Sequence, residues 1–258
     1  MPEIPDVEVY RRNLVSRLGG KQVSEVIVHR PKRCPPADVV TEAVVGAHLA
    51  GIDRDGKELV LRFDNGRRLG VHLMLAGKFD MSPDVDKLEE RRFSLRFDSG
   101  DILTLSDRQG FATVTLDPQP ETAPDALADT FTEEYFDTKV RAAGAKNVKA
   151  FLVDQDVVRG IGNKYSDEIL WTAGISPEST VKALPDDARR ALYVAIRSVL
   201  GEAVEAMDKL HPGAISGRMR EGLKIHDRDK SPSGNPVITA TIAGKKTYYC
   251  PLEQIVYA

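Results

Sequence analysis

The chain has 258 residues, of which 41% are hydrophobic and 29% are charged, so it can form a hydrophobic core and its composition excludes wholesale disorder. No apolar run approaches the roughly 18 residues of a membrane helix and no signal segment opens the chain, which predicts a cytoplasmic protein without a membrane partner. Its two cysteines, Cys34 and Cys250, do not indicate a disulfide framework, and the net charge of −3 is not that of a general nucleic-acid binder.

The first half of the chain predicts one helix followed by short strands. Apolar residues recur at three- and four-residue steps over residues 6–18, which predicts a helix that ends at Gly19-Gly20. Hairpin turns are predicted at 64–66 and 99–100. Strands are predicted at 23–29, 59–63, 68–73, 93–97, 102–105 and 112–116. Together these elements predict an antiparallel β-sandwich with a capping helix.

The second half is predicted to be mainly helical. Asn147 is expected to cap a helix that runs to Val153, Asn163 another that runs to Thr172, and Pro185 suits the first turn of a long third helix. Residues 237–249 predict a hairpin with its turn at 243–246. The chain is therefore predicted to be an α+β multidomain protein, with a sandwich domain (1–116), a linker rich in Pro, Ala and acidic residues (117–130), a helical domain (131–223) and a terminal hairpin (224–258).

Positive charge is concentrated near the end of the chain. Residues 209–246 contain eight Lys or Arg side chains and three acidic ones, which gives this segment a net charge of +5. A basic patch of this kind is either a solvated face or a place where nucleic-acid phosphates bind.

The N-terminus, Met1-Pro2-Glu3-Ile4-Pro5-Asp6, can carry chemistry. A proline at position 2 permits removal of Met1, and its secondary amine can then attack an aldehyde or sugar C1′ to give an iminium. Glu3 is close enough to donate or accept a proton. A Pro-Glu start can also simply lead into a helix, so these residues alone leave both alternatives open.

A second motif lies in the helical half. The segment from Val148 through Asp154-Gln155 and Gly160-Ile-Gly162-Asn163 to Pro177 predicts a helix, a glycine turn and a second helix whose first N–H groups can bind phosphate. This segment resembles the helix–two-turns–helix signature of the formamidopyrimidine-DNA glycosylase/endonuclease VIII family, and Pro2-Glu3-Ile4-Pro5 resembles that family's N-terminal motif. The resemblance covers essentially the whole chain.

The resemblance implies an enzyme that flips a damaged base out of double-stranded DNA, works as a monomer and needs no cofactor. It implies that Pro2 is the nucleophile, that Glu3 is the general acid/base, and that Lys57 grips the phosphate beside the lesion. A lysine in a hairpin turn can also be merely solvated. The DNA-binding positions that the resemblance implies are His72, Lys149, Asn163 and Lys245, with Lys245 in place of the family's finger arginine.

The terminal hairpin departs from the family pattern of four zinc-binding cysteines. Cys250 keeps the third position, Val237 stands at the first, Glu253 follows Leu252 where the fourth belongs, and the second is lost with a shortened hairpin. One thiol cannot form a four-ligand zinc site, so a zincless finger without metal is expected.

The residues that would fill the space of the flipped nucleotide also differ. Leu75 takes the place of a methionine wedge, and Phe111 is kept and is expected to stack or wedge. Gln109 and Gly110 replace two arginines that contact the orphaned base, which leaves Arg108 as the nearest arginine. These changes predict weak discrimination among opposite bases.

The leading hypothesis is a base-excision repair DNA glycosylase that also cleaves abasic sites by β,δ-elimination and acts on oxidised bases, in the cytoplasm or at the nucleoid. The alternative is a non-catalytic protein that binds damaged DNA on the same scaffold. A structural nucleic-acid-binding protein of the ribosomal type would leave Pro2, Glu3 and Lys57 unexplained.

Overall fold

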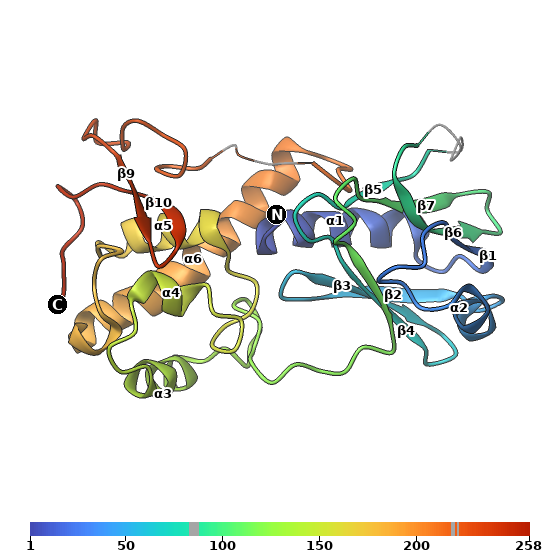
Figure 1. Cartoon of the computed structure of the whole chain (residues 1–258), viewed down its shortest axis with the longest axis horizontal. Coiled ribbons are helices and arrows are strands. Elements are labelled where there is room, and N and C mark those ends of the chain that lie inside the picture. The colour runs from blue at the N-terminus through green and yellow to red at the C-terminus, as the bar shows by residue number, and fades with distance from the viewer. Residues whose placement is uncertain (83–87, 218–219, 221) are drawn as a thin grey trace. The chain divides into compact units, whose positions relative to one another are not determined.

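The computed structural model describes residues 1–82, 88–217, 220 and 222–258 (Figure 1). The chain divides into two compact units. Unit 1 comprises Met1–Pro120 and Met207–Met219, and unit 2 comprises Glu121–Ala206 and Arg220–Ala258. The terminal hairpin therefore groups with the helices in unit 2. Among the described residues, no helix is both long and apolar enough to cross a membrane.

The described residues of unit 1 form two four-stranded antiparallel sheets. The first sheet has the order β1 (Val23–Val28), β6 (Arg91–Phe97), β7 (Ile102–Ser106) and β5 (Lys78–Asp80). The second sheet has the order β2 (Leu49–Asp55), β3 (Glu58–Phe63), β4 (Arg68–His72) and β8 (Thr113–Leu116). Side chains of both sheets line one interior, namely Leu61, Leu69, Val71, Phe79, Phe93, Leu95, Leu103 and Leu105. The predicted sandwich is confirmed.

Helix α1 (Ile4–Leu18) covers the second sheet, where it contacts β2 and β3. Its buried face, which includes Val7, Tyr10 and Leu14, follows the predicted spacing of three and four residues. The helix begins two residues earlier than predicted because residues 3 and 6 form a capping box. A short helix, α2 (Ala37–Val44), contacts β1 and was not predicted.

Unit 2 contains α3 (Glu133–Ala142), α4 (Val148–Leu152), α5 (Asn163–Thr172), the 3-10 turn η2 (Val181–Ala183) and most of α6 (Asp186–Leu210). Asn147 caps α4 as predicted, since its side chain accepts hydrogen bonds from the N–H groups of Lys149 and Ala150. The predicted cap of α5 is wrong. Gly162 is the N-cap residue, and Asn163 is already helical.

The predicted terminal hairpin is confirmed as β9 (Ile238–Ile242) and β10 (Lys245–Tyr249). Ile242 pairs with Lys245, so the turn has two residues rather than the predicted four. Ala243 and Gly244 both have positive φ, 50° and 72°. Two positive φ values match the type I′ turn, whose twist suits a tight hairpin.

Candidate active site and nucleic-acid interface

The N-terminus of α1 is fixed by its own side chains. The N–H of Glu3 donates to Oδ2 of Asp6 at 2.9 Å, and the two residues form a reciprocal capping box. Glu3 is 3% exposed and Asp6 is 1% exposed, while Pro2 is half-buried directly before them. The side chain of Asp6 thus holds the backbone at Glu3, directly after Pro2.

Two side chains connect α1 to the turn that carries Lys57. Arg54 Nε donates to Glu8 Oε2 at 3.1 Å, and its Nη1 donates to the carbonyl of Gly56 at 3.2 Å. Burial opposes the ionisation of Glu8, but hydrogen bonds and charges from Arg11 and Arg54 outweigh it and lower the pKa of this carboxyl. Glu8 is therefore a carboxylate that holds the turn near the first residues of α1, about 8 Å of helix from Glu3.

Lys57 occupies a two-residue turn between β2 and β3. Gly56 precedes it with a φ of 61°, which is the conformation that the first position of a type II′ turn requires. Lys57 is only 8% exposed. Its stem is therefore covered, which distinguishes it from an ordinary solvated hairpin lysine.

The strand register brings the turn of Lys57, His72 and the loops 73–77 and 107–112 to one end of the sandwich. Glu58, next to Lys57, pairs with His72, and His72 pairs with Thr113. In the first sheet, Lys78 pairs with Ser106. The loops 73–77 and 107–112 therefore cross between the sheets side by side, next to the turn of Lys57.

The loop after His72 has a defined shape. His72 Nδ1 accepts a hydrogen bond from the N–H of Met74 at 3.0 Å, and the N–H of Gly77 donates to the carbonyl of Leu73 at 2.8 Å. A Cβ atom at Gly77 would lie 2.3 Å from that carbonyl oxygen, so only glycine closes this loop without displacement. Leu75 projects from the loop with 53% of its surface exposed.

The second loop is shaped by one buried carboxylate. Asp107, 1% exposed, accepts hydrogen bonds from the N–H groups of Gln109, Phe111 and Ala112 at 2.9, 2.6 and 2.7 Å. Phe111 is left 44% exposed, and Arg108 is also exposed. The two adjacent loops thus present two apolar tips, Leu75 and Phe111.

In unit 2, Gln155 shapes the glycine turn before α5. Its Nε2 donates to the carbonyls of Val153 and Ile161 at 2.9 and 3.0 Å, and its Oε1 accepts from the N–H of Gly160 at 2.9 Å. Gly160 has a φ of 99°. The sequence motif contains Gln155, but no local signal in the sequence indicates this role.

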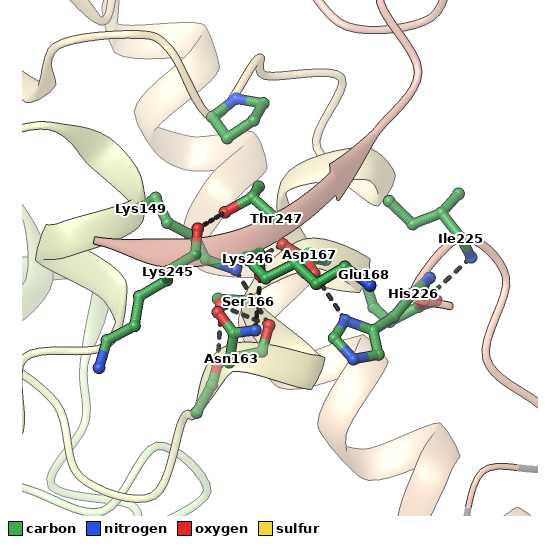
Figure 2. Close-up of polar contacts among 12 residues, drawn as sticks. Lys149, Asn163, Ser166, Asp167, Glu168, Ile225, His226, Lys245, Lys246 and Thr247 are labelled. Atoms are coloured by element: carbon green, nitrogen blue, oxygen red, sulfur yellow. Dashed lines mark hydrogen bonds and ion pairs between the residues drawn. The ribbon is translucent and has the colours of Figure 1, made fainter. Parts of the chain in front are cut away.

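The structure contradicts the expectation that Lys149 binds DNA. Lys149 is fully buried, and its Nζ pairs with Asp167 and donates to the carbonyl of Asn163 at 3.0 Å (Figure 2). Asp167 Oδ2 also lies 2.6 Å from Nδ1 of His226. Lys149 therefore orients the start of α5 from within the protein and is not available to a phosphate.

Asn163 and Lys245 lie close together. Nδ2 of Asn163 donates to the carbonyl of Lys246 at 2.7 Å, which joins the start of α5 to the hairpin. Oδ1 of Asn163 is buried with no hydrogen-bond partner among the described residues. Lys245 and Lys246 are exposed, and Figure 2 shows the Lys245 side chain extending away from the buried cluster. The start of α5 and Lys245 therefore lie near each other, whereas Lys246 extends the other way (Figure 2), with its Nζ 4.7 Å from the ring centroid of Tyr248.

The residues of the hairpin do not fit a four-ligand zinc site. Oε1 of Glu253 accepts from Ser231 Oγ at 2.6 Å and from Asn235 Nδ2 at 2.7 Å, and its Oε2 accepts from Trp171 Nε1 at 2.5 Å. These hydrogen bonds lower the pKa of Glu253. Within the described ranges, no three His, Cys, Asp or Glu side chains gather as metal ligands. Glu253 joins the base of the hairpin to α5 by hydrogen bonds instead.

Comparison with known proteins identifies the family. A model of the formamidopyrimidine-DNA glycosylase N-terminal domain matches residues 1–114, and a model of the formamidopyrimidine-DNA glycosylase H2TH domain matches residues 122–211. A formamidopyrimidine-DNA glycosylase of Carboxydothermus hydrogenoformans is 34% identical, with 97% of this chain and 98% of the relative covered. One of Lactobacillus gasseri is 30% identical, with both chains covered completely.

Solved structures give the same result. The complex between Lactococcus lactis Fpg and abasic-site DNA matches with a TM-score of 0.88 and 26% identity, over 98% of this chain and 99% of that one. MutM in complex with DNA that contains carbocyclic 8-oxo-G matches with a TM-score of 0.87 and 27% identity, over 98% of this chain and 100% of that one. The fold is therefore that of a helix–two-turns–helix DNA glycosylase. The chain belongs to the formamidopyrimidine-DNA glycosylase family.

Proposed function

We propose that this protein is a monomeric base-excision repair enzyme that excises oxidised bases from double-stranded DNA and cleaves the resulting abasic site. One observation carries the proposal. Pro2 directly precedes the buried Glu3 at the start of α1, and Glu8 and Arg54 hold the turn of Lys57 near the same helix. A nucleophile, a proton carrier and a phosphate-binding cation are thus supplied by one end of unit 1.

The proposed reaction begins after Met1 is removed. The secondary amine of Pro2 attacks C1′ of the damaged nucleotide, and the C1′–base bond breaks as the base leaves with a proton. The C1′–O4′ bond of the sugar ring then breaks as O4′ takes up a proton and the amine nitrogen loses its own, which gives the iminium. The iminium acidifies C2′, so loss of a proton there expels the 3′ phosphate by β-elimination, and δ-elimination then expels the 5′ phosphate. Glu3 exchanges protons with the leaving base and the sugar.

The other predicted residues bind DNA in this proposal. Lys57 and His72 grip the phosphates beside the lesion, and Asn163 and Lys245 bind backbone through the surface at the start of α5. Leu75 and Phe111 fill the space that the flipped nucleotide leaves, with Arg108 beside them. In this proposal, residues 1–116 form the catalytic domain, 117–130 a linker, 131–223 the DNA-binding domain and 224–258 a zincless finger. The enzyme would act in the cytoplasm or at the nucleoid.

A non-catalytic protein that binds damaged DNA would require the same phosphate contacts, but it would not require the secondary amine of Pro2 beside the buried carboxyl of Glu3. Borohydride trapping on a duplex with one abasic site separates the two. An enzyme of the proposed kind gives a covalent protein–DNA adduct and cut strands, whereas a binder gives only a shifted complex. Glu3→Gln is the informative variant, because it should impair base excision more than abasic-site cleavage.

A further inference from the structure

The loop 107–112 has no arginine at the positions that would contact an orphaned base, since Gln109 and Gly110 stand there. The structure nevertheless places a guanidinium at the tip of this loop. Cζ of Arg33 lies 5.6 Å from the ring centroid of Phe111, in the geometry of a cation–π contact. Arg33 belongs to the segment between β1 and α2, far from Phe111 in the sequence.

The backbone around Arg33 is fixed to both sheets. Its carbonyl accepts a hydrogen bond from the N–H of Val114 in β8 at 3.0 Å. The carbonyl of Arg92, in β6, accepts from the N–H groups of His29 and Arg30 at 2.9 and 3.2 Å, and the Arg92 guanidinium donates to the carbonyl of Lys32. Hydrogen bonds to β6 and β8 therefore fix the backbone at Arg33, while its side chain is exposed.

The conformation of Arg33 is unfavourable for its residue type. The N–H of Cys34 donates to the carbonyl of Pro31 at 3.1 Å, which closes a turn, and Arg33 occupies the third position with a φ of 64°. Glycine or asparagine is preferred at such a position. A strained residue that a framework maintains is a reason to look for a function. Here the strained backbone carries the side chain that lies over Phe111.

We infer that Arg33 reads the base left unpaired when the damaged nucleotide leaves the duplex, and thereby replaces the missing arginines of the loop. This inference rests on the proposed function. If Phe111 enters the base stack, the guanidinium over its ring lies at the edge of the orphaned base. A guanidinium has five donors and no acceptor. Cytosine alone offers two adjacent acceptors, O2 and N3, on its pairing edge, so it is the base that Arg33 should favour.

The test compares four duplexes in which a tetrahydrofuran abasic analogue lies opposite C, A, G or T. Binding of each duplex is measured for the wild type, Arg33→Gly, Arg33→Lys and Arg108→Ala. We expect the wild type to bind the duplex with cytosine about fivefold or more tightly than the others, which is the lower limit for a two-pronged arginine contact. Arg33→Gly relieves the strained conformation, so it should fold normally yet lose the preference.

The other two variants separate the possible causes. Arg33→Lys keeps a cation over Phe111 but loses the planar fork, so it should also lose the preference. Arg108→Ala, the matched arginine within the loop, should keep it. Equal binding of all four duplexes by the wild type, a uniform loss for Arg33→Gly, or loss of the preference in Arg108→Ala would each overturn the inference. Because the analogue is not cleaved, these results do not depend on catalysis, whereas absence of a trapped adduct would reject only the proposed reaction.

Discussion

The buried pair of Lys149 and Asp167 gives a quantitative test of how α5 is held. Both side chains are fully buried, so Lys149→Met leaves the Asp167 carboxylate in the interior without its lysine partner. Removal of one partner of a buried pair typically costs about 3–5 kcal/mol. We expect a value near the lower limit, about 3 kcal/mol, because His226 still lies 2.6 Å from Asp167. The double variant Lys149→Met/Asp167→Asn should cost clearly less than the sum of the two single variants, since it leaves no orphaned charge.

Trp171, the single tryptophan of the chain, lies on the same helix and reports on unit 2 by its fluorescence. With an m-value of about 1–3 kcal/mol/M, a loss of 3 kcal/mol moves the urea midpoint by about 1–3 M. Lys146→Met is the matched control, because the partly exposed pair of Lys146 and Asp154 should contribute at most about 1 kcal/mol. Equal shifts for Lys149→Met and Lys146→Met, or strict additivity in the double variant, would refute this account.

Three further predictions concern DNA binding, zinc and the hairpin. Lys57→Ala and Lys245→Ala should each weaken binding to all duplexes in similar proportion and lower the salt dependence by roughly one unit of slope, whereas Lys21→Ala, at the far end of the first sheet, should not. A loss limited to one base context would argue against phosphate contact. Chelators should leave Trp171 emission unchanged, and one zinc per chain by elemental analysis would contradict that. The lowered pKa of Glu253 means that its ionised form stabilises the hairpin above the ordinary glutamate value of about 4.3 and that this contribution is lost as the pH falls through the lower folded value. Trp171 emission should therefore change in acid, and a Glu253→Gln variant that keeps the same transition would contradict the assignment.

The helices and hairpins that could be predicted from the sequence are those marked by residues within the element itself. Gly66 and Gly100 have φ values of 84° and 89°, and turn residues at these positions correctly located two hairpins. Strand β2 was missed because its buried positions do not alternate, and the acidic residues Asp53 and Asp55 interrupt its apolar pattern. The short helix α2 was missed because valines give it little helix propensity.

The candidate site was predictable only where a residue acts through its own local motif. Pro2, Glu3 and the glycine turn are recognisable from neighbouring residues. Lys149 was misassigned because its partner Asp167 lies in the next helix and no spacing rule connects the two. The contact between Arg33 and Phe111 depends on the pairing of distant strands, so sequence inspection alone could not reveal it.

The proposed reaction requires the secondary amine of Pro2 to form the covalent bond to DNA, so the decisive experiment is to locate that bond. Wild-type protein is trapped with borohydride on a duplex with one abasic site, digested and analysed by mass spectrometry. We predict a reduced sugar on the nitrogen of Pro2 in chains that lack Met1, with slower trapping for Pro2→Gly. Active protein in which Met1 is wholly retained, or an adduct on a lysine side chain such as that of Lys57, would contradict the claim.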